Sequence, residues 1–188
     1  PTCPTAPTSA SLSVRITLPS LSVFVQHNAS DSDPCALVSP FFQRKIPTGL
    51  IEPVADTSFD YRSPRRLAAI IEEKESPVDH CFCWEDRDNL DTKALYEQAR
   101  LTSQASAIGL TVLSNQPGLQ FYTGHGIQPG ITGHDNRRYG PFSGLCLEPQ
   151  KFPDAPNHPH FPSIEIGPDR AYYQRVCYRF SHSSFQEA

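Results

Sequence analysis

The amino-acid sequence predicts an all-β protein built as a β-sandwich, and three observations support this prediction. The 188 residues include 19 prolines and 10 glycines, which interrupt helices and favour strands joined by turns. Many short segments are rich in β-branched and aromatic residues and alternate between apolar and polar positions, as half-buried strands do. Helical patterns are few and short, which argues against a helical bundle.

The N-terminal part of the chain is expected to contain a leader and the first strands. Residues 1–13 are rich in Pro, Thr, Ser and Ala, which is typical of a disordered segment. We therefore place one sandwich domain at residues 14–188. Within it, residues 14–25 (VRITLPSLSVFV) predict one or two strands that break at Pro19. Further strand-like stretches follow at residues 35–43 and 50–54.

The middle of the chain contains the two helical patterns. Residues 63–75 (SPRRLAAIIEEKE) predict a helix, with Ser63 as its N-cap and Pro64 in its first turn. Residues 89–100 (NLDTKALYEQAR) predict either a second helix or an irregular insertion. Between them, residues 78–84 predict a strand.

The C-terminal part is expected to consist of strands. Residues 107–114 and 119–123 predict two strands that pair with each other across a turn at Asn115–Gly118. The remaining expected elements are a Gly-rich loop at residues 124–141, a strand at 142–147 and a final strand at 171–181.

Composition and charge limit the possible partners. The net charge of −4 gives no electrostatic reason to expect binding to nucleic acid or to an anionic membrane. No stretch approaches the roughly 18 apolar residues that a membrane-spanning helix needs. The sequence contains no Met and starts without the basic and apolar stretches of a signal peptide, so a mature form, a trimmed form and a fragment all agree with it. The compartment stays open between the cytoplasm and secretion.

The cysteines and histidines do not predict a metal site. The segments His80-Cys81-Phe82-Cys83 and His158-Pro159-His160 lack the paired C-x-x-C or H-x-x-x-H spacing of structural zinc sites. The six cysteines are also too widely spread for a small disulfide-stapled scaffold. Cys146 and Cys177 lie in apolar contexts, and we expect them to pack as small buried residues.

Glu148 is the first candidate for a functional side chain. It follows the apolar run Leu145–Leu147 directly, and prolines stand at positions 149, 153, 156, 159 and 162 behind it. A carboxylate that projects from the end of a strand into a cleft can act as a general base. The alternative is a solvated glutamate at a strand end, as most Glu side chains are exposed.

Two further segments could line the same cleft. Asp79 and His80 are adjacent in a predicted strand, so their side chains point to opposite faces and only one of them can face a given cleft. Gln120 lies among Phe121 and Tyr122, and its amide both donates and accepts hydrogen bonds, which suits a polyhydroxylated ligand. Each of these residues could equally be an ordinary surface residue.

Taken together, several multi-residue motifs resemble the aldose 1-epimerases, or galactose mutarotases, over about residues 36–181. The motifs occur in the family's order. They are Ile46–Gly49, Ser58–Arg62, Val78–Phe82, Gln116–Gly124, Gly144–Gln150, Phe152–Asn157 and Phe161–Ser163.

The resemblance implies an isomerase with a large antiparallel β-sandwich whose concave face binds sugar. Family members interconvert the α and β anomers of free aldoses such as galactose and glucose without a cofactor. A glutamate takes the proton of the C1 hydroxyl, a histidine gives a proton to the ring oxygen, and the ring opens and closes on its other face. By motif, Glu148 matches this glutamate, Asp79 the sugar-binding aspartate, and Gln120 a glutamine that lines the site.

The sequence departs from the family pattern in several ways. Family members are much longer, and their N-terminal part carries an arginine and a histidine of the site that are not matched here. The motif N-H-x-Y-F-N, which supplies the histidine usually assigned as the acid, is not found, and its expected position at residues 11–15 holds no His. Gly124-His125-Gly126 stands where the family usually has G-N-F, and Pro149 stands where Thr is common.

These departures imply a sandwich that is incomplete at its N-terminus and has the base but not the usual acid. The loss of one proton-transfer partner costs a factor of about 100 to 10,000 in rate. We therefore expect weak turnover or none. Two alternatives stay open: a non-catalytic carbohydrate-binding module, and a fragment without a function of its own.

Overall fold

The computed structural model describes residues 14–17, 22–24, 47, 49–72, 77–83, 93–104 and 106–182, with the backbone alone for 14–17, 22–24 and 135. The predicted leader at residues 1–13 and the predicted strand at residues 35–43 lie outside this part of the chain. Among the described residues, no helix combines the length and the apolar character needed to cross a bilayer.

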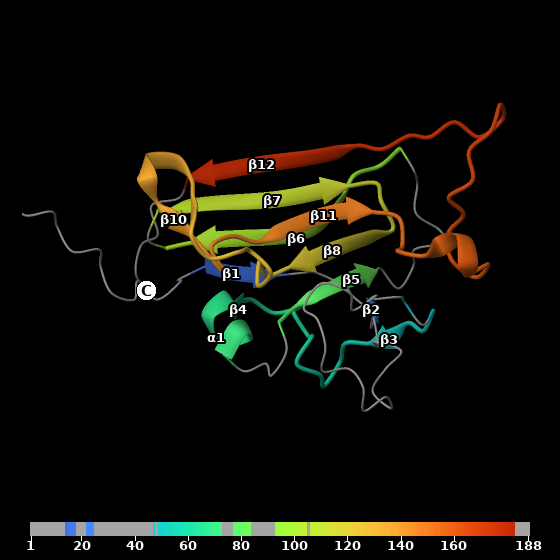
Figure 1. Ribbon diagram of the computed structural model, residues 1–188. Coiled ribbons are helices and arrows are strands. Elements are labelled where there is room, and N and C mark those ends of the chain that lie inside the picture. Colours follow the sequence, from blue (N-terminus) through green and yellow to red (C-terminus); the bar gives the residue numbers. More distant parts are fainter. Residues whose placement is uncertain are drawn as a thin grey trace, which may run out of the picture.

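Two five-stranded antiparallel sheets make up most of the fold (Figure 1). The first sheet has the order β12 (Val176–His182), β7 (Ile108–Ser114), β6 (Tyr96–Ser103), β1 (Val14–Thr17) and β4 (Arg65–Arg66). The second has the order β11 (Cys146–Gln150), β8 (Gly118–Tyr122), β5 (Asp79–Cys83), β2 (Ser22–Phe24) and β3 (Glu52–Pro53). The smaller elements are the helix α1 (Leu67–Glu72), the hairpin β9 (Ile131–Thr132) and β10 (Arg138–Tyr139), and the 3-10 turns η2 (His134–Asn136) and η3 (Ala155–Asn157).

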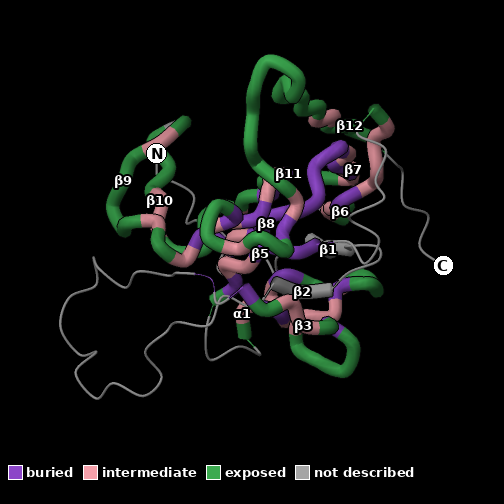
Figure 2. The backbone as a smooth tube through the Cα atoms, turned by 90° about the vertical axis from the view of Figure 1, so that its right-hand side faces the viewer, coloured by how far each residue is buried: buried purple, intermediate pink, exposed green. Residues whose placement is uncertain are grey.

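The main hydrophobic core joins residues of both sheets. Ala99 of β6 and Val112 of β7 are buried with Phe82, Phe121 and Leu147 of the second sheet. Figure 2 shows the buried residues along β7 and β8, whereas the loop between β11 and β12 is mostly exposed. Strands β5, β8 and β11 of the second sheet therefore give one face to this core and keep the other for a different use. The prediction of an antiparallel β-sandwich is confirmed.

Strands β7 and β8 form as predicted, but they do not pair with each other. β7 lies between β6 and β12, whereas β8 lies between β5 and β11. The connection between them is buried: Gln98 Nε2 donates a 2.7 Å hydrogen bond to the Gln116 carbonyl, and Asn115 Oδ1 accepts one of 2.8 Å from the Arg175 N–H. These bonds to distant segments replace the hydrogen bonds of a hairpin and carry the chain from one sheet to the other.

Both helix predictions need correction. Arg65 and Arg66 form β4, which pairs with β1, so the helix begins at Leu67 and Ser63 does not cap it. The described part of the second pattern, from Tyr96 onward, is the strand β6. A register shift between Glu97 and Ala99 interrupts the alternation of its side chains, which explains why the pattern did not read as a strand.

The strand predicted at residues 142–147 lies further along the chain, at Cys146–Gln150. Phe142 has a positive φ of 63°, and the Ser143 N–H bonds the Gly140 carbonyl, so a turn occupies the predicted start. Glu148 is consequently the middle residue of β11, and not the end of a strand as we expected. Pro149 fits within β11 because this strand is at the sheet edge and pairs only with β8.

Candidate functional site

The candidate site is built on the face of the second sheet that points away from the main core. On β8, Leu119 and Phe121 are buried in that core, so the alternation of side chains places Gln120 and Tyr122 on the opposite face. On β11, Leu147 faces the core and Glu148 the other side. The two-residue alternation of side chains along β8 and β11 thus places polar side chains of both strands on one surface of the sheet.

Strand register brings these polar residues next to one another. Gln120 on β8, which lies between β11 and β5, is the direct partner of Glu148 on β11 and of Cys81 on β5. Tyr122 is the direct partner of Cys146 on β11 and of Asp79 on β5. These residues therefore form two rungs, which are rows of directly paired residues across β11, β8 and β5. One rung is Glu148, Gln120 and Cys81, and the other is Cys146, Tyr122 and Asp79.

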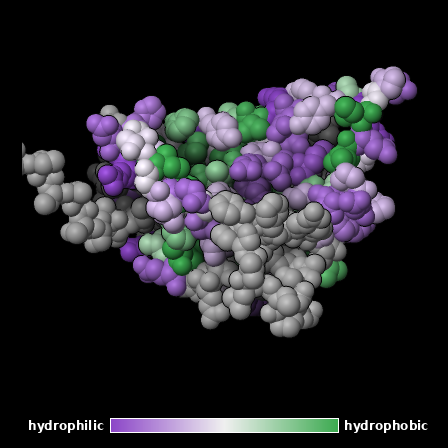
Figure 3. All heavy atoms as spheres, viewed as in Figure 1, coloured by the Kyte–Doolittle hydropathy of each residue, from purple (hydrophilic) through white to green (hydrophobic). Residues whose placement is uncertain are grey.

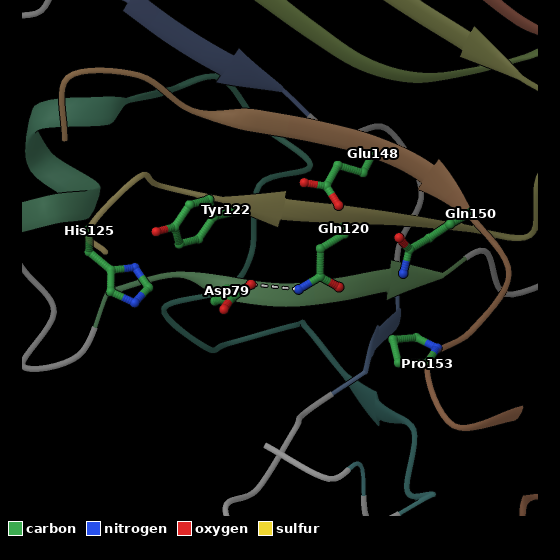
Figure 4. Close-up of a pocket in the computed structure, with 7 residues that line it drawn as sticks. All are labelled: Asp79, Gln120, Tyr122, His125, Glu148, Gln150 and Pro153. Atoms are coloured by element: carbon green, nitrogen blue, oxygen red, sulfur yellow. Dashed lines mark hydrogen bonds between the residues drawn. The ribbon is translucent and has the colours of Figure 1, made fainter. Parts of the chain in front are cut away.

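One open cavity of about 420 Å³ lies over these rungs. The residues that line it are Asp79, Gln120, Tyr122, His125, Glu148, Gln150 and Pro153. Figure 4 shows their side chains around a common space, and the space-filling view shows hydrophilic residues gathered over β11 (Figure 3). The volume is within the range of about 300–1,000 Å³ that is typical of small-molecule sites.

All three candidate site residues lie in this one cavity, although their position does not test their roles. His80 does not line it and packs against Phe59 instead, with 4.5 Å between the ring centroids. The sequence reasoning did not place His125, Gln150 or Pro153 in the site. For His125 a signal existed, because this residue marks a departure from the family pattern in Gly124–Gly126.

A hydrogen bond fixes the amide of Gln120. Its Nε2 donates to Asp79 Oδ1 over 2.8 Å, as the dashed line in Figure 4 shows. The side chain is only 8% exposed, and its Oε1 is buried without a hydrogen-bond partner. A buried oxygen of this kind is costly unless it accepts a hydrogen bond. Gln120 therefore has an amide oxygen that accepts no hydrogen bond from the described part of the protein.

The proline-rich segment after β11 closes one end of the site. Phe152 and Phe161 stack edge to face at 5.3 Å and pack on Cys81 and Cys83, which point to the same face of the sheet as the cavity residues. A Cβ atom at Gly118 would lie 3.0 Å from Phe152, so the absence of a side chain at this position permits the contact. The segment thus forms a packed wall, from which Pro153 reaches the cavity.

Negative charge dominates the cavity. Asp79 and Glu148 are acidic, and no Lys or Arg is among the described residues that line it. The thiol of Cys146 lies beside these acids: desolvation raises its pKa, and the Glu148 and Asp79 carboxylates raise it further. Cys146 therefore stays a neutral thiol at pH 7. An anionic ligand would be repelled from this site.

The cysteines differ from the expectation of two buried thiols near the C-terminus. Cys146 is exposed and Cys177 is half-buried, whereas Cys81 and Cys83 are fully buried. Cys146 shares the outward face of β11 with Glu148, two residues away, because that strand has only one apolar face. The apolar neighbours of Cys146 in the sequence are thus the residues that face the core.

The His158-Pro159-His160 segment supports the wall. His160 Nε2 lies 2.9 Å from the Gly49 carbonyl oxygen, and His158 Nε2 lies 3.4 Å from Asp154 Oδ2. In the described part of the chain, no three His, Cys, Asp or Glu side chains come together in a way that could hold a metal ion.

The Ser58–Arg62 motif also lies outside the cavity. The Arg62 guanidinium donates two hydrogen bonds to the Asp60 carboxylate, of 2.9 and 2.6 Å. This side-chain hydrogen bonding holds the pKa of Asp60 below its usual value. The motif therefore builds a turn and contributes no side chain to the site.

Comparison with known proteins identifies a family and several similar relatives. The model of the family described as aldose 1-epimerase matches residues 38–179. The galactose mutarotase of Rattus norvegicus is 37% identical over 143 residues, which are 76% of this chain and 40% of the relative. The aldose 1-epimerase of Escherichia coli is 30% identical over 148 residues, with 75% and 41% covered. The chain thus spans about 40% of the length of these curated relatives.

Solved structures show the same fold. A GalM/aldose epimerase homologue from C. elegans aligns with a TM-score of 0.70 and 24% identity, over 91% of this chain and 46% of that one. A galactose 1-epimerase from Lactobacillus acidophilus aligns with a TM-score of 0.62 and 21% identity, over 91% and 44%.

Proposed function

The chain belongs to the aldose 1-epimerase family, and we propose that its cavity binds a free aldohexose and interconverts the α and β anomers. One observation carries this proposal: Glu148, Gln120 and Asp79 lie on neighbouring strands and line one cavity. The relatives are named galactose mutarotase and aldose 1-epimerase, which makes galactose and glucose the first substrates to test.

The polar groups of the cavity suit a neutral, hydroxyl-rich ligand. The two carboxylates and the Gln120 Oε1 are hydrogen-bond acceptors, so they call for several O–H donors on the ligand. A pyranose provides such donors around its ring. The charge of the cavity disfavours sugar phosphates and sugar acids, because a second anion would lie close to Asp79 and Glu148.

Glu148 is the base in this proposal. Its strand position directs the carboxylate into the cavity, next to Gln120 on β8. With the sugar held by Asp79 and Gln120, the carboxylate takes the proton of the C1 hydroxyl, so that C1 becomes a carbonyl carbon when the ring opens. The fixed Asp79–Gln120 pair orients the sugar before the proton moves, which lowers the entropic cost of reaching the reactive geometry.

Polarimetry tests the proposal directly. Freshly dissolved α-D-glucose should mutarotate faster with the protein than in buffer alone, and α-D-galactose should do the same. Glu148→Gln should lower the catalysed rate by a factor of about 100 to 10,000, since it removes the proton acceptor. Glu165→Gln is the matched control, because this glutamate is exposed in the loop between β11 and β12 and does not line the cavity.

Calorimetry with galactose separates catalysis from binding. Binding together with acceleration supports the proposal. Binding without acceleration by the folded wild-type protein would reduce the site to a carbohydrate-binding module. A folded protein that neither binds galactose or glucose nor accelerates their mutarotation would refute the proposed function.

A further inference from the structure

We infer that His125 is the proton donor to the ring oxygen of the bound sugar. The inference deepens the proposed function and rests on it. His125 lines the same cavity as Glu148 but comes from the loop after β8. The resemblance did not predict this role, because the family usually has Asn at this position.

The other described histidines serve elsewhere. His80 packs on Phe59, and His158 and His160 pack around Phe161 in the wall. His134 and His182 are exposed, on η2 and at the end of β12. Among the described residues that line the cavity, His125 is therefore the one imidazole, and imidazole is the side chain best suited to proton donation near neutral pH.

The backbone on both sides of His125 is fixed by contacts. Gly124 has a φ of +74°, and a Cβ atom there would lie 2.1 Å from the Gly144 carbonyl oxygen, so the loop lies directly on the segment that leads into β11. The Gly124 carbonyl also accepts a 2.9 Å hydrogen bond from the Phe142 N–H. On the other side, the Gly126 N–H donates a 2.7 Å hydrogen bond to Tyr122 Oη.

These contacts also set the position of the imidazole. Its ring packs edge to face against the Tyr122 ring, with 4.9 Å between the centroids. Figure 4 shows His125 and Tyr122 at one end of the cavity, with Glu148 further along it on the neighbouring strand. A sugar between them can meet a base from β11 and an acid from the β8 loop. A group held this rigidly needs little reorganisation before it reacts.

The other titratable groups that line the cavity are acidic or neutral. The groups that face the cavity are the carboxylates of Asp79 on β5 and Glu148 on β11 and the phenol of Tyr122 on β8. The neutral thiol of Cys146 lies beside the two acids. No described cavity residue is a Lys or Arg that would repel an imidazolium.

The reaction balances with these two groups alone. Glu148 takes the proton of the C1 hydroxyl, and the O1–H electron pair becomes the second bond of the C1 carbonyl. The C1–O5 bond breaks, its electron pair stays on O5, and O5 takes a proton from a ring N–H of His125. After rotation about C1–C2, O5 attacks the other face of C1 and both protons return. No oxidant, reductant or co-reactant is consumed.

The test compares the wild-type protein with His125→Asn and His125→Gln. We expect kcat for galactose to fall by about 100-fold or more in both, whereas the calorimetric Kd changes by less than about threefold. His134→Gln is the matched control and should retain the wild-type rate. Thermal unfolding checks that each variant is folded.

The outcomes separate this inference from the proposed function. A wild-type protein that accelerates mutarotation, together with folded His125 variants of equal rate, would overturn the inference and leave the proposed function intact. Loss of sugar binding in the His125 variants would assign His125 to binding and overturn its role as donor. A wild-type protein without acceleration would end both claims.

Discussion

The hydrogen bond between Asp79 and Gln120 allows a quantitative test of the site that does not depend on any substrate. Gln120 is 8% exposed, and its Nε2 donates to the Asp79 carboxylate over 2.8 Å. Hydrogen bonds to charged groups contribute about 1.5–3 kcal/mol to stability. Because the cavity is open to water beside Asp79, the lower end of this range applies, and we expect a coupling of about 1.5 kcal/mol.

The measurement is a double-mutant cycle with Asp79→Ala, Gln120→Ala and the double variant. Urea unfolding at pH 7 gives the free energy of unfolding of each protein. Asp79→Ala should destabilise by at least the coupling energy, because it leaves a buried amide without its acceptor. The double variant should be less destabilised than the sum of the single variants, since neither partner is then left behind.

A control cycle with an uncoupled pair defines the smallest coupling energy that counts as an interaction. Asp79→Ala combined with Glu165→Ala should be additive within about 0.5 kcal/mol, because Glu165 is exposed in the loop between β11 and β12. If the Asp79–Gln120 coupling does not exceed this limit, the pair does not hold the cavity in shape, and our account of how the sugar is oriented is wrong.

Two further predictions concern the wall and the thiol. Gly118→Ala should lower the free energy of unfolding in urea by about 1–3 kcal/mol, because the added Cβ atom would lie 3.0 Å from Phe152. Gly144→Ala is the control and should leave the free energy of unfolding nearly unchanged, because the space around its Cβ atom is open. Cys146 should react more slowly with iodoacetamide at pH 8 than a model thiol, since its raised pKa leaves less thiolate, and Glu148→Gln should accelerate this labelling in peptide mass spectrometry. Equal labelling rates of Cys146 in the wild-type protein and in Glu148→Gln would contradict this prediction about the thiol.

Local patterns predicted the strands near the site well, and failed where distant contacts decide the structure. β5 and β8 lie within two residues of their predicted positions, because their alternation and flanking turns are local features. The segment from Tyr96 to Arg100 has helix-forming residues, yet it belongs to the strand β6, which pairs with β7 along its length and with β1 from Arg100 to Ser103. Backbone pairing on two edges outweighs the small differences in intrinsic propensity.

The sequence by itself determined the family and the residue types of the site, since Glu148, Asp79 and Gln120 stand in recognisable motifs. Alternation also determined that Asp79 and His80 must face opposite sides. Only the tertiary structure decided that β8 pairs with β5 and β11 and not with β7, and that the β8 loop carries His125 into the same cavity. The physical reason is that the facing of a side chain repeats with a local period, whereas strand neighbours are chosen by hydrogen bonds and burial between segments far apart in the chain.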